Sequence, residues 1–128
     1  SRPSPFVEGL KTNYERTVGA FVDQCVPDPQ LVNLRRWGRQ ILMRAEADAA
    51  IQLVTSFYGM DLSPDVGRIN VRTLIVHGTD DAIVPVAAAQ CLATQIPDCM
   101  RMLLPGAGHV PSMTHPQQVA GAINELFV

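Results

Sequence analysis

Two neighbouring acids and one histidine have the residue types and the spacing of a proton-transfer pair. Asp80 and Asp81 follow one short apolar run, and His109 follows the next apolar run along the chain. A carboxylate that accepts a hydrogen bond from Nδ1 of an imidazole fixes the tautomer of the ring, while Nε2 can take a proton from a nucleophile. The sequence therefore predicts an acid–histidine pair, and spacing alone leaves open which acid is the partner.

The segments around these residues predict a strand–helix–strand–helix order. The expected elements are a strand over 72–77 closed by Gly78, a helix from Pro85 to Ile96, a strand over 100–104, and a helix after a capping-box pattern at 114–117. The first run is β-branched and apolar throughout, which predicts a strand buried on both faces. Two parallel strands joined by a helix end at the same sheet edge, about 4.8 Å apart, so an acid can reach the histidine.

The first half of the chain predicts helices only. Three are expected: from Val7 through Phe21 to a stop at Pro27, from about Gln30 to Met43, and from Ala47 to Tyr58 with Gly59 as a C-terminal cap. Turn-forming residues cluster at 61–65. The chain is therefore expected to divide into a helical segment, residues 1–62, and a strand-containing segment, residues 63–128.

Both chemistry-bearing loops resemble those of the α/β-hydrolase superfamily. Residues 74–85, Leu-Ile-Val-His-Gly-Thr-Asp-Asp-Ala-Ile-Val-Pro, are similar to the acid loop of that family, and residues 106–111, Gly-Ala-Gly-His-Val-Pro, to its histidine loop. The resemblance implies a partial α/β fold with a mostly parallel sheet. It places the acid three residues after the glycine of the loop, which selects Asp81 over Asp80. It also implies that the helical segment is similar to the family's lid.

The nucleophile half of the family pattern is missing from the sequence. No G-x-S-x-G occurs in it, and no His-Gly oxyanion motif follows an early strand. The resemblance implies the C-terminal part of a serine hydrolase for small, ester-like substrates, with Asp81 as the acid and His109 as the base of a triad. Without a nucleophile and an oxyanion hole this pair has nothing to activate, so we expect the chain alone to be inactive.

A sheet of two parallel strands is expected to need a partner. Parallel sheets are covered on both faces and usually have more strands, and an open edge exposes unpaired backbone groups. We therefore expect a complementary N-terminal half or a second copy of the chain. The alternative function is a non-catalytic hydrolase-like module that binds a ligand or associates with proteins, such as one joined to a regulatory protein.

Composition excludes several other classes of function. The formal net charge is −2, with 47% hydrophobic and 17% charged residues, and no long block of one charge sign. Nucleic-acid and membrane-surface partners are therefore not expected. No apolar run reaches the length of about 18 residues that a membrane span needs, and the first five residues lack the apolar region of a signal peptide. Three cysteines without a C-x-x-C pair predict reduced thiols in a cytoplasmic protein.

The remaining reactive side chains are assigned structural roles. His77 is expected to be packed or hydrogen-bonded at a strand end, and His115 to begin a helix. Ser112 follows His109, which is the wrong chain order for the family's nucleophile. The cysteines are read as buried, inert thiols: Cys25, Cys91 and Cys99. The histidines and acids match no metal-binding spacing, so no metal or other cofactor is expected.

The large apolar side chains of the helical segment leave two interpretations. Packing between helices is favoured, and an acyl pocket beneath a lid is the alternative. The residues concerned are Phe6, Phe21, Trp37, Met43, Phe57, Tyr58 and Met60.

Overall fold

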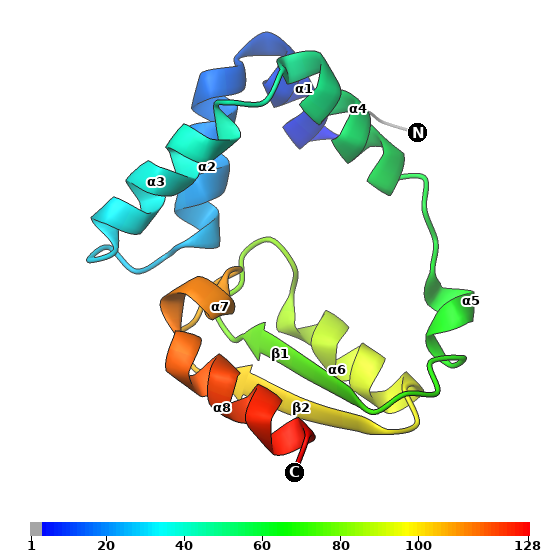
Figure 1. The fold of residues 1–128 in the computed structure, drawn as a ribbon. Helices are drawn as coiled ribbons and strands as arrows, with labels where there is room; N and C mark the ends of the chain where they lie inside the picture. The colour runs from blue at the N-terminus through cyan, green and yellow to red at the C-terminus, as the bar shows by residue number, and fades with distance from the viewer. Residues whose placement is uncertain (1–3) are drawn as a thin grey trace. The chain divides into compact units, whose positions relative to one another are not determined.

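The structure is a computed structural model that describes residues 4–128 (Figure 1). Its elements are α1 (Pro5–Thr12), α2 (Tyr14–Cys25), α3 (Val32–Leu42), α4 (Ala47–Phe57), α5 (Ser63–Val66), β1 (Thr73–Gly78), α6 (Val86–Gln95), β2 (Cys99–Leu104), α7 (Pro111–Thr114) and α8 (Pro116–Leu126). The chain forms two compact units. Unit 1 comprises the described residues up to Asp23 together with Gln30–Asp61, and unit 2 comprises Gln24–Pro29 and Leu62–Val128.

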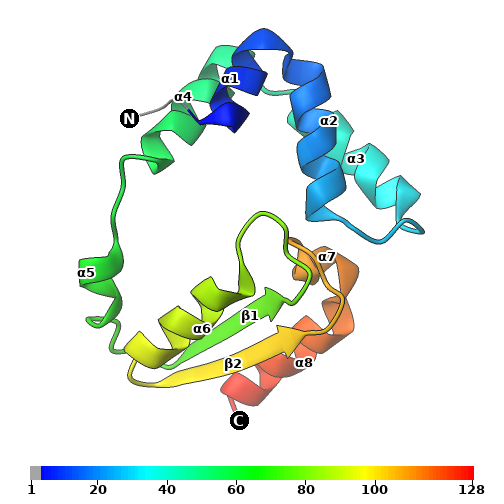
Figure 2. The same cartoon turned by 180° about the vertical axis from the view of Figure 1, so that it is seen from behind.

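Unit 2 contains a parallel two-stranded sheet between two helices. Thr73 of β1 lies opposite Cys99 of β2, and Gly78 lies opposite Leu104, so both strands end at the same edge. Helices α6 and α8 cover opposite faces of the sheet (Figures 1 and 2). Each contributes a small buried residue, Ala89 from α6 and Ala122 from α8. The strand–helix–strand–helix order predicted from the sequence is confirmed.

The prediction that β1 is buried on both faces is wrong. Residues 73–77 are half-buried, and only Gly78 at the end of the strand is buried. The physical reason is the width of the sheet: β1 pairs with β2 along one edge only within the part of the chain that the structure describes. A strand needs neighbours on both edges, and helices over both faces, to lose its contact with water.

Unit 1 is a group of helices with its own small core. Helix α1 packs against α4, and the rings of Phe6 and Phe21 lie with their centroids 5.3 Å apart. The buried residues are Val7, Leu10, Val18 and Val22. Val7, Leu10 and Val18 belong to the apolar stripe that the sequence predicts, and Val22 follows its last member, so the helical character of this segment is confirmed.

The single first helix that this stripe predicts is in fact two helices, broken at Asn13. Asn13 has φ −154° and ψ 86°, outside the helical region. Its side-chain oxygen accepts a hydrogen bond from the N–H of Arg16 at 3.1 Å, as an N-cap residue does. An apolar stripe can continue across such a break, because the next helix begins at once at Tyr14.

Two predicted helix caps also differ from the structure. Gly59 does not form a left-handed C-terminal cap, because Gly106 is the one residue with a positive φ among those described. The capping box at 114–117 does not form either, since the residue before α8 is His115 and makes no side-chain capping bond. The hydroxyl of Thr114 instead lies 2.8 Å from Nδ1 of His115.

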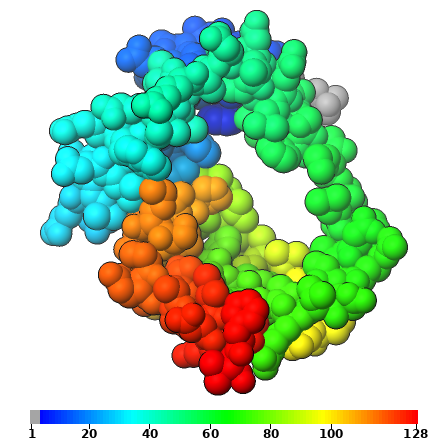
Figure 3. All heavy atoms as spheres, in the orientation of Figure 1, coloured from blue at the N-terminus to red at the C-terminus, as the bar shows by residue number. Residues whose placement is uncertain are grey.

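Many large apolar side chains are exposed on both units. The C-terminal residues, red in Figure 3, lie at the surface, where Phe127 is 82% exposed. Helix α4 ends in two further exposed aromatic residues, Phe57 and Tyr58. Within residues 4–128, no helix combines the length and the apolar character that crossing a bilayer requires.

Candidate functional site

Two loops meet where β1 and β2 end. The acid loop, residues 79–85, leaves β1, and the histidine loop, residues 105–110, leaves β2. Hydrogen bonds join them: the N–H of Asp80 donates to the carbonyl of Ala107 at 3.0 Å, and the N–H of Gly106 donates to the Thr79 side-chain hydroxyl at 2.9 Å. The two loops are therefore held as one surface at the carboxyl edge of the sheet, where open α/β folds bind their ligands.

Gly78 permits the close approach of these loops. A β-carbon at this position would overlap the carbonyl oxygens of Ala107 and Gly108. Any larger residue would therefore push the histidine loop away from the end of β1. This close approach is the physical reason for the glycine in the acid-loop sequence.

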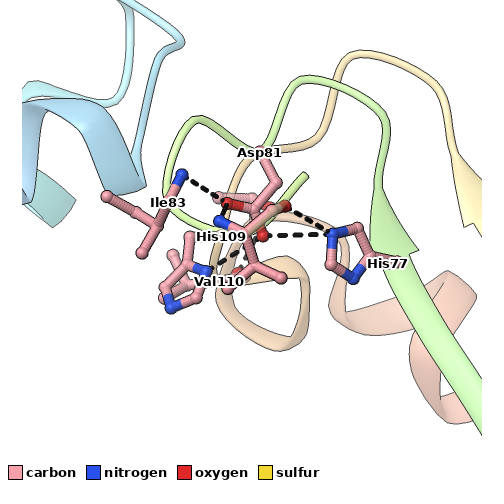
Figure 4. Close-up of polar contacts among 7 residues, drawn as sticks. His77, Asp81, Ile83, His109 and Val110 are labelled. Carbon is pink, nitrogen blue, oxygen red and sulfur yellow. Dashed lines mark hydrogen bonds and ion pairs between the residues drawn. The ribbon is translucent and has the colours of Figure 1, made fainter. Parts of the chain in front are cut away.

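Asp81 and His109 form a hydrogen bond at the centre of this surface (Figure 4). Nδ1 of His109 lies 2.9 Å from Oδ2 of Asp81, whose side chain is 4% exposed. Asp80 is exposed, and its carboxylate accepts a hydrogen bond from the neighbouring Thr79 hydroxyl. The structure thus pairs Asp81 with the histidine and leaves Asp80 outside the pair.

The second oxygen of the Asp81 carboxylate is held by the backbone of its own loop. Oδ1 accepts a hydrogen bond from the N–H of Ile83 at 2.8 Å (Figure 4). It also accepts one from the N–H of Val84 at 2.9 Å. Burial opposes ionisation, but the bonds from Val84, His109 and Ile83 outweigh it and lower the pKa of Asp81 below its ordinary value. Asp81 is therefore an ionised acceptor at neutral pH.

An ionised Asp81 determines which nitrogen of His109 carries the proton. A carboxylate only accepts hydrogen bonds, so Nδ1 of His109 is the donor and Nε2 of the neutral ring has a free lone pair. The side chain is 33% exposed, and no group of residues 4–128 hydrogen-bonds to Nε2. The ring can therefore act as a general base towards a group outside the described residues.

A segment from the far end of α2 holds the backbone of the histidine loop. The N–H of His109 donates to the carbonyl of Cys25 at 2.9 Å, and Cys25 and Val26 are buried in unit 2. Gly108 lies so close to this segment that a β-carbon would overlap the Cys25 carbonyl and the Pro27 ring. Residues 24–29 therefore hold the backbone of His109, whereas Asp81 holds its side chain.

The cysteines differ from one another. Burial, reinforced by the negative charge of Asp81, raises the pKa of the Cys25 thiol to about 11. Cys25 is thus a buried and unreactive thiol, as expected. The same expectation is wrong for Cys91, which is exposed on α6, while Cys99 is half-buried at the start of β2. All three are free thiols.

The other predicted candidates lie outside the pair. His77 is hydrogen-bonded, with Nε2 2.9 Å from the carbonyl oxygen of Val84, and His115 precedes α8, so both have the expected structural positions. Ser112 is exposed in the short helix α7. Among the residues that the structure describes, no three His, Cys, Asp or Glu side chains are grouped to hold a metal ion.

Unit 1 contains an apolar cavity of about 340 Å³. Of the seven apolar residues considered from the sequence, only Phe6 and Phe21 line it. The other five, Trp37, Met43, Phe57, Tyr58 and Met60, are exposed. The cavity is completed mainly by smaller aliphatic side chains, which periodicity alone does not distinguish from ordinary core residues: Leu10, Val18, Leu42, Ala49, Ala50, Leu53 and Val54, among others.

Comparison with known proteins supports the resemblance seen in the loops. The sequence model of the family described as "Alpha/beta hydrolase family" matches residues 3–122, which is nearly the whole chain. The chain belongs to the alpha/beta hydrolase family. As a family member it has a partial fold, with a two-stranded parallel sheet and the helices described above.

The curated proteins similar to this chain include esterases and non-heme haloperoxidases. The chain is 24% identical over 125 residues to a pimeloyl-[acyl-carrier protein] methyl ester esterase from Nitrosomonas europaea, covering 94% of this chain and 50% of that protein. It is 35% identical over 100 residues to a non-heme chloroperoxidase from Streptomyces lividans, covering 77% of this chain and 33% of that protein. The chain thus spans about half the length, or less, of these relatives.

Solved structures show the same fold. An esterase from Exiguobacterium antarcticum has a TM-score of 0.88 at 18% identity, covering 96% of this chain and 46% of that one. A bromoperoxidase from Bacillus anthracis has a TM-score of 0.87 at 23% identity, covering 95% of this chain and 46% of that one. In both cases the likeness extends over almost all of this chain and less than half of the other.

Sequence reasoning missed three backbone groups of the site. The N–H groups of Ile83 and Val84 form a turn on the Asp81 side chain, a pattern that aspartate commonly makes and that could have been expected. The Cys25 carbonyl that holds His109 had no comparable signal. Its contact joins residues far apart in the sequence and depends on backbone position, not on residue type.

Proposed function

We propose that this chain carries the acid and the histidine of an ester-hydrolysing active site whose nucleophile lies outside residues 1–128. One observation carries the proposal: a buried, ionised Asp81 holds His109 by Nδ1, 2.9 Å from Oδ2, at the carboxyl edge of parallel strands. Membership of a hydrolase family, with methyl ester esterases among the relatives, supports carboxylic esters of small molecules as the substrate class.

In the assembled site the two residues would have separate roles. Nε2 of His109 takes the proton of a serine hydroxyl as its oxygen attacks the ester carbonyl, and the imidazolium then gives that proton to the leaving alcohol. Water repeats the sequence on the acyl-serine and restores the enzyme. Asp81 stays ionised, orients the ring and stabilises its positive charge. The oxyanion donors, like the serine, would come from outside this chain.

The partner that fits best is a complementary N-terminal half. A second copy of the chain could cover the open sheet, but it has the same sequence and would bring no G-x-S-x-G. The half-buried residues of β1, with one paired edge in the described part of the chain, support a missing neighbour strand. Under this proposal residues 1–62 are the lid-like segment and residues 63–128 the C-terminal part of the hydrolase core.

The test begins with the coding region upstream of residue 1. We expect it to encode, in frame, a strand followed by G-x-S-x-G. The segment that carries this motif is then produced with and without residues 1–128, and both samples are treated with a fluorophosphonate probe. The serine of the motif should be labelled only when residues 1–128 are present, and residues 1–128 alone should not be labelled.

Matched variants connect the labelling to the proposed pair. His109→Gln should abolish labelling of the assembled protein, whereas Asp80→Asn, which changes an exposed neighbour of the acid, should leave it unchanged. Labelling that is equally fast without residues 1–128, or in His109→Gln, would exclude the proposal. An upstream start codon without the motif would favour the non-catalytic module.

A further inference from the structure

His77 is a half-buried polar side chain that the proposed mechanism does not use. It is the penultimate residue of β1, directly before the close contact at Gly78, and its side chain is 15% exposed. Its Nε2 lies 3.4 Å from Oδ2 of Asp81 (Figure 4). The same nitrogen lies 2.9 Å from the carbonyl oxygen of Val84. Two imidazoles therefore face the same carboxylate oxygen, His109 at hydrogen-bond distance and His77 slightly farther away.

The contact with Val84 defines the protonation of the His77 ring. A backbone carbonyl only accepts hydrogen bonds, so Nε2 of His77 must be the donor. Oδ2 of Asp81 lies 3.4 Å from the same nitrogen. His77 thus has the opposite tautomer from His109, in which Nδ1 is the donor.

The bonds of Val84 show what this donor controls. The N–H of Val84 donates to Oδ1 of Asp81 at 2.9 Å, and its carbonyl accepts from His77 at 2.9 Å. Val84 is therefore held on one side by the carboxylate and on the other by β1. Without His77 the end of the acid loop would keep only its bond to Asp81, and the loop could rotate together with the carboxylate.

We propose that His77 is a positioning residue, which fixes the acid loop through Val84 so that Oδ2 of Asp81 faces His109. The catalytic consequence rests on the proposed function, but the positioning itself is a property of this chain. His77 acts through Asp81 and does not contact the group that would react. This role goes beyond that of a packed histidine, because it requires the Nε2–H group of His77 to donate to the Val84 carbonyl.

The first test measures the tautomer of His77 in the unmodified chain. Long-range ¹H–¹⁵N spectra of the imidazoles at neutral pH distinguish a protonated Nε2 from a protonated Nδ1. We expect His77 with the proton on Nε2 and His109 with the proton on Nδ1. A His77 ring with the proton on Nδ1 could not donate to Val84, and this result would overturn the proposal without any variant.

The second test uses two variants that differ in the donor. His77→Gln keeps an N–H group near the end of the side chain, whereas His77→Leu removes it at similar volume. Loss of the bond from His77 to the Val84 carbonyl should let the loop open more often and so expose the Val84 amide, which donates to Asp81. Hydrogen exchange of this amide should therefore become about tenfold faster in His77→Leu, the size expected for loss of one hydrogen bond, and should be restored in His77→Gln. His115→Leu, a change at the start of α8, is the control and should leave this amide unchanged.

Two outcomes of this exchange experiment would contradict the proposal. One is an unchanged Val84 amide in a folded His77→Leu chain. The other is an equal acceleration in His77→Leu and His77→Gln, which would mean that the ring acts by shape alone. If His77→Leu does not fold, the comparison of His77→Gln with the unmodified chain, together with the tautomer, still decides the question.

The assembled hydrolase gives a separate catalytic measurement. His77→Leu should lower kcat about tenfold with little change in KM, because ground-state binding of substrate does not depend on the direction of Asp81. His77→Gln should recover most of the loss. An assembled protein without activity would contradict the proposed function but not the positioning role, since tautomer and amide exchange are measured on the chain itself.

Discussion

The carboxylate of Asp81 makes more directed contacts than any other side chain of the site. Oδ1 accepts two backbone N–H groups, and Oδ2 accepts the ring of His109 with His77 close by. The bonds from Val84, His109 and Ile83 favour the charged form of the acid and outweigh its burial. The carboxylate is therefore fixed in direction and in charge before any partner or substrate binds.

Asparagine at position 81 removes this negative charge and keeps the shape of the side chain. In the assembled hydrolase Asp81→Asn should lower kcat by about 10⁴-fold, because an amide N–H can favour the wrong tautomer of His109. Asp80→Asn is the matched control, one residue away and exposed, and should retain nearly full activity. Steady-state hydrolysis of 4-nitrophenyl butyrate measures both. Equal losses in the two variants would mean that Asp81 has no special role.

The lowered pKa of Asp81 predicts how the stability of the chain changes in acid. A carboxyl whose pKa is lower in the folded state stabilises the fold fully above the unfolded value of about 3.9, and this contribution is lost as the pH falls through the folded value. Asp81→Asn should therefore flatten the fall in unfolding free energy below about pH 4. Urea unfolding at a series of pH values measures it, and an unchanged slope in the variant would contradict the prediction.

The cysteines provide a test of burial at the base of the histidine loop. Burial raises the pKa of Cys25 to about 11, and only the thiolate form of a cysteine reacts with iodoacetamide. At about pH 8 the reagent should therefore modify exposed Cys91 at least about tenfold faster than buried Cys25. The reaction of Cys25 should accelerate as the pH approaches 11 and in urea. Mass spectrometry of the peptides follows each site. Similar rates at Cys25 and Cys91 in the folded chain would show that residues 24–29 are not packed in unit 2.

At the scale of elements, two loops and one helix end converge on the histidine. The acid loop and histidine loop are joined by hydrogen bonds, and residues 24–29 hold the backbone of His109. Gly108 lies within this contact and has no room for a side chain. The position of the imidazole therefore depends on segments from three parts of the sequence.

A methyl group at Gly108 tests this convergence. Gly108→Ala would overlap the Cys25 carbonyl and the Pro27 ring, and should lower the free energy of unfolding by about 1–3 kcal/mol. Gly121→Ala on α8 is the control, because nothing lies within 4 Å of its added β-carbon; it should be neutral or stabilising by about 0.5–1 kcal/mol. Urea denaturation measures both variants. A fully stable Gly108→Ala chain would contradict the packing of this loop.

The sequence predicts the elements better than it predicts their ends. Apolar periodicity identifies the longer helices and both strands, but not the four-residue helices α5 and α7. The stripe from Val7 to Phe21 does not reveal the break at Asn13, since apolar spacing continues across it. The residue types of the acid loop lead to Asp81 through a family resemblance, whereas the donors to its carboxylate are backbone groups. The Cys25 contact is a consequence of tertiary packing, which no local pattern encodes.

At the scale of the whole molecule, the exposed apolar surface and the narrow sheet both support the proposal of a complementary half. Phe57, Tyr58 and Phe127 are each more than half exposed, and β1 is only half-buried. Exposed apolar surface of this kind commonly marks an interface. A chain that spans about half of its relatives would leave such surface where the other half packs.

A complementary half should therefore stabilise this chain. Residues 1–128 alone should associate with themselves as their concentration rises, and addition of the N-terminal half should suppress this and raise Tm, since a partner that binds only the folded state stabilises it. Size-exclusion chromatography with light scattering and thermal unfolding measure the two effects. A stable, cooperative monomer at micromolar concentration, unaffected by the N-terminal half, would contradict the need for a partner.

The ring of His109 provides the most direct test of the proposed acid–histidine pair. Imidazole ¹H–¹⁵N spectra of residues 1–128 at neutral pH should show His109 with its proton on Nδ1 and a bare Nε2, and Asp81→Asn should abolish this preference while Asp80→Asn preserves it. A His109 ring with its proton on Nε2, or one that keeps the Nδ1 proton equally well in Asp81→Asn, would contradict the account.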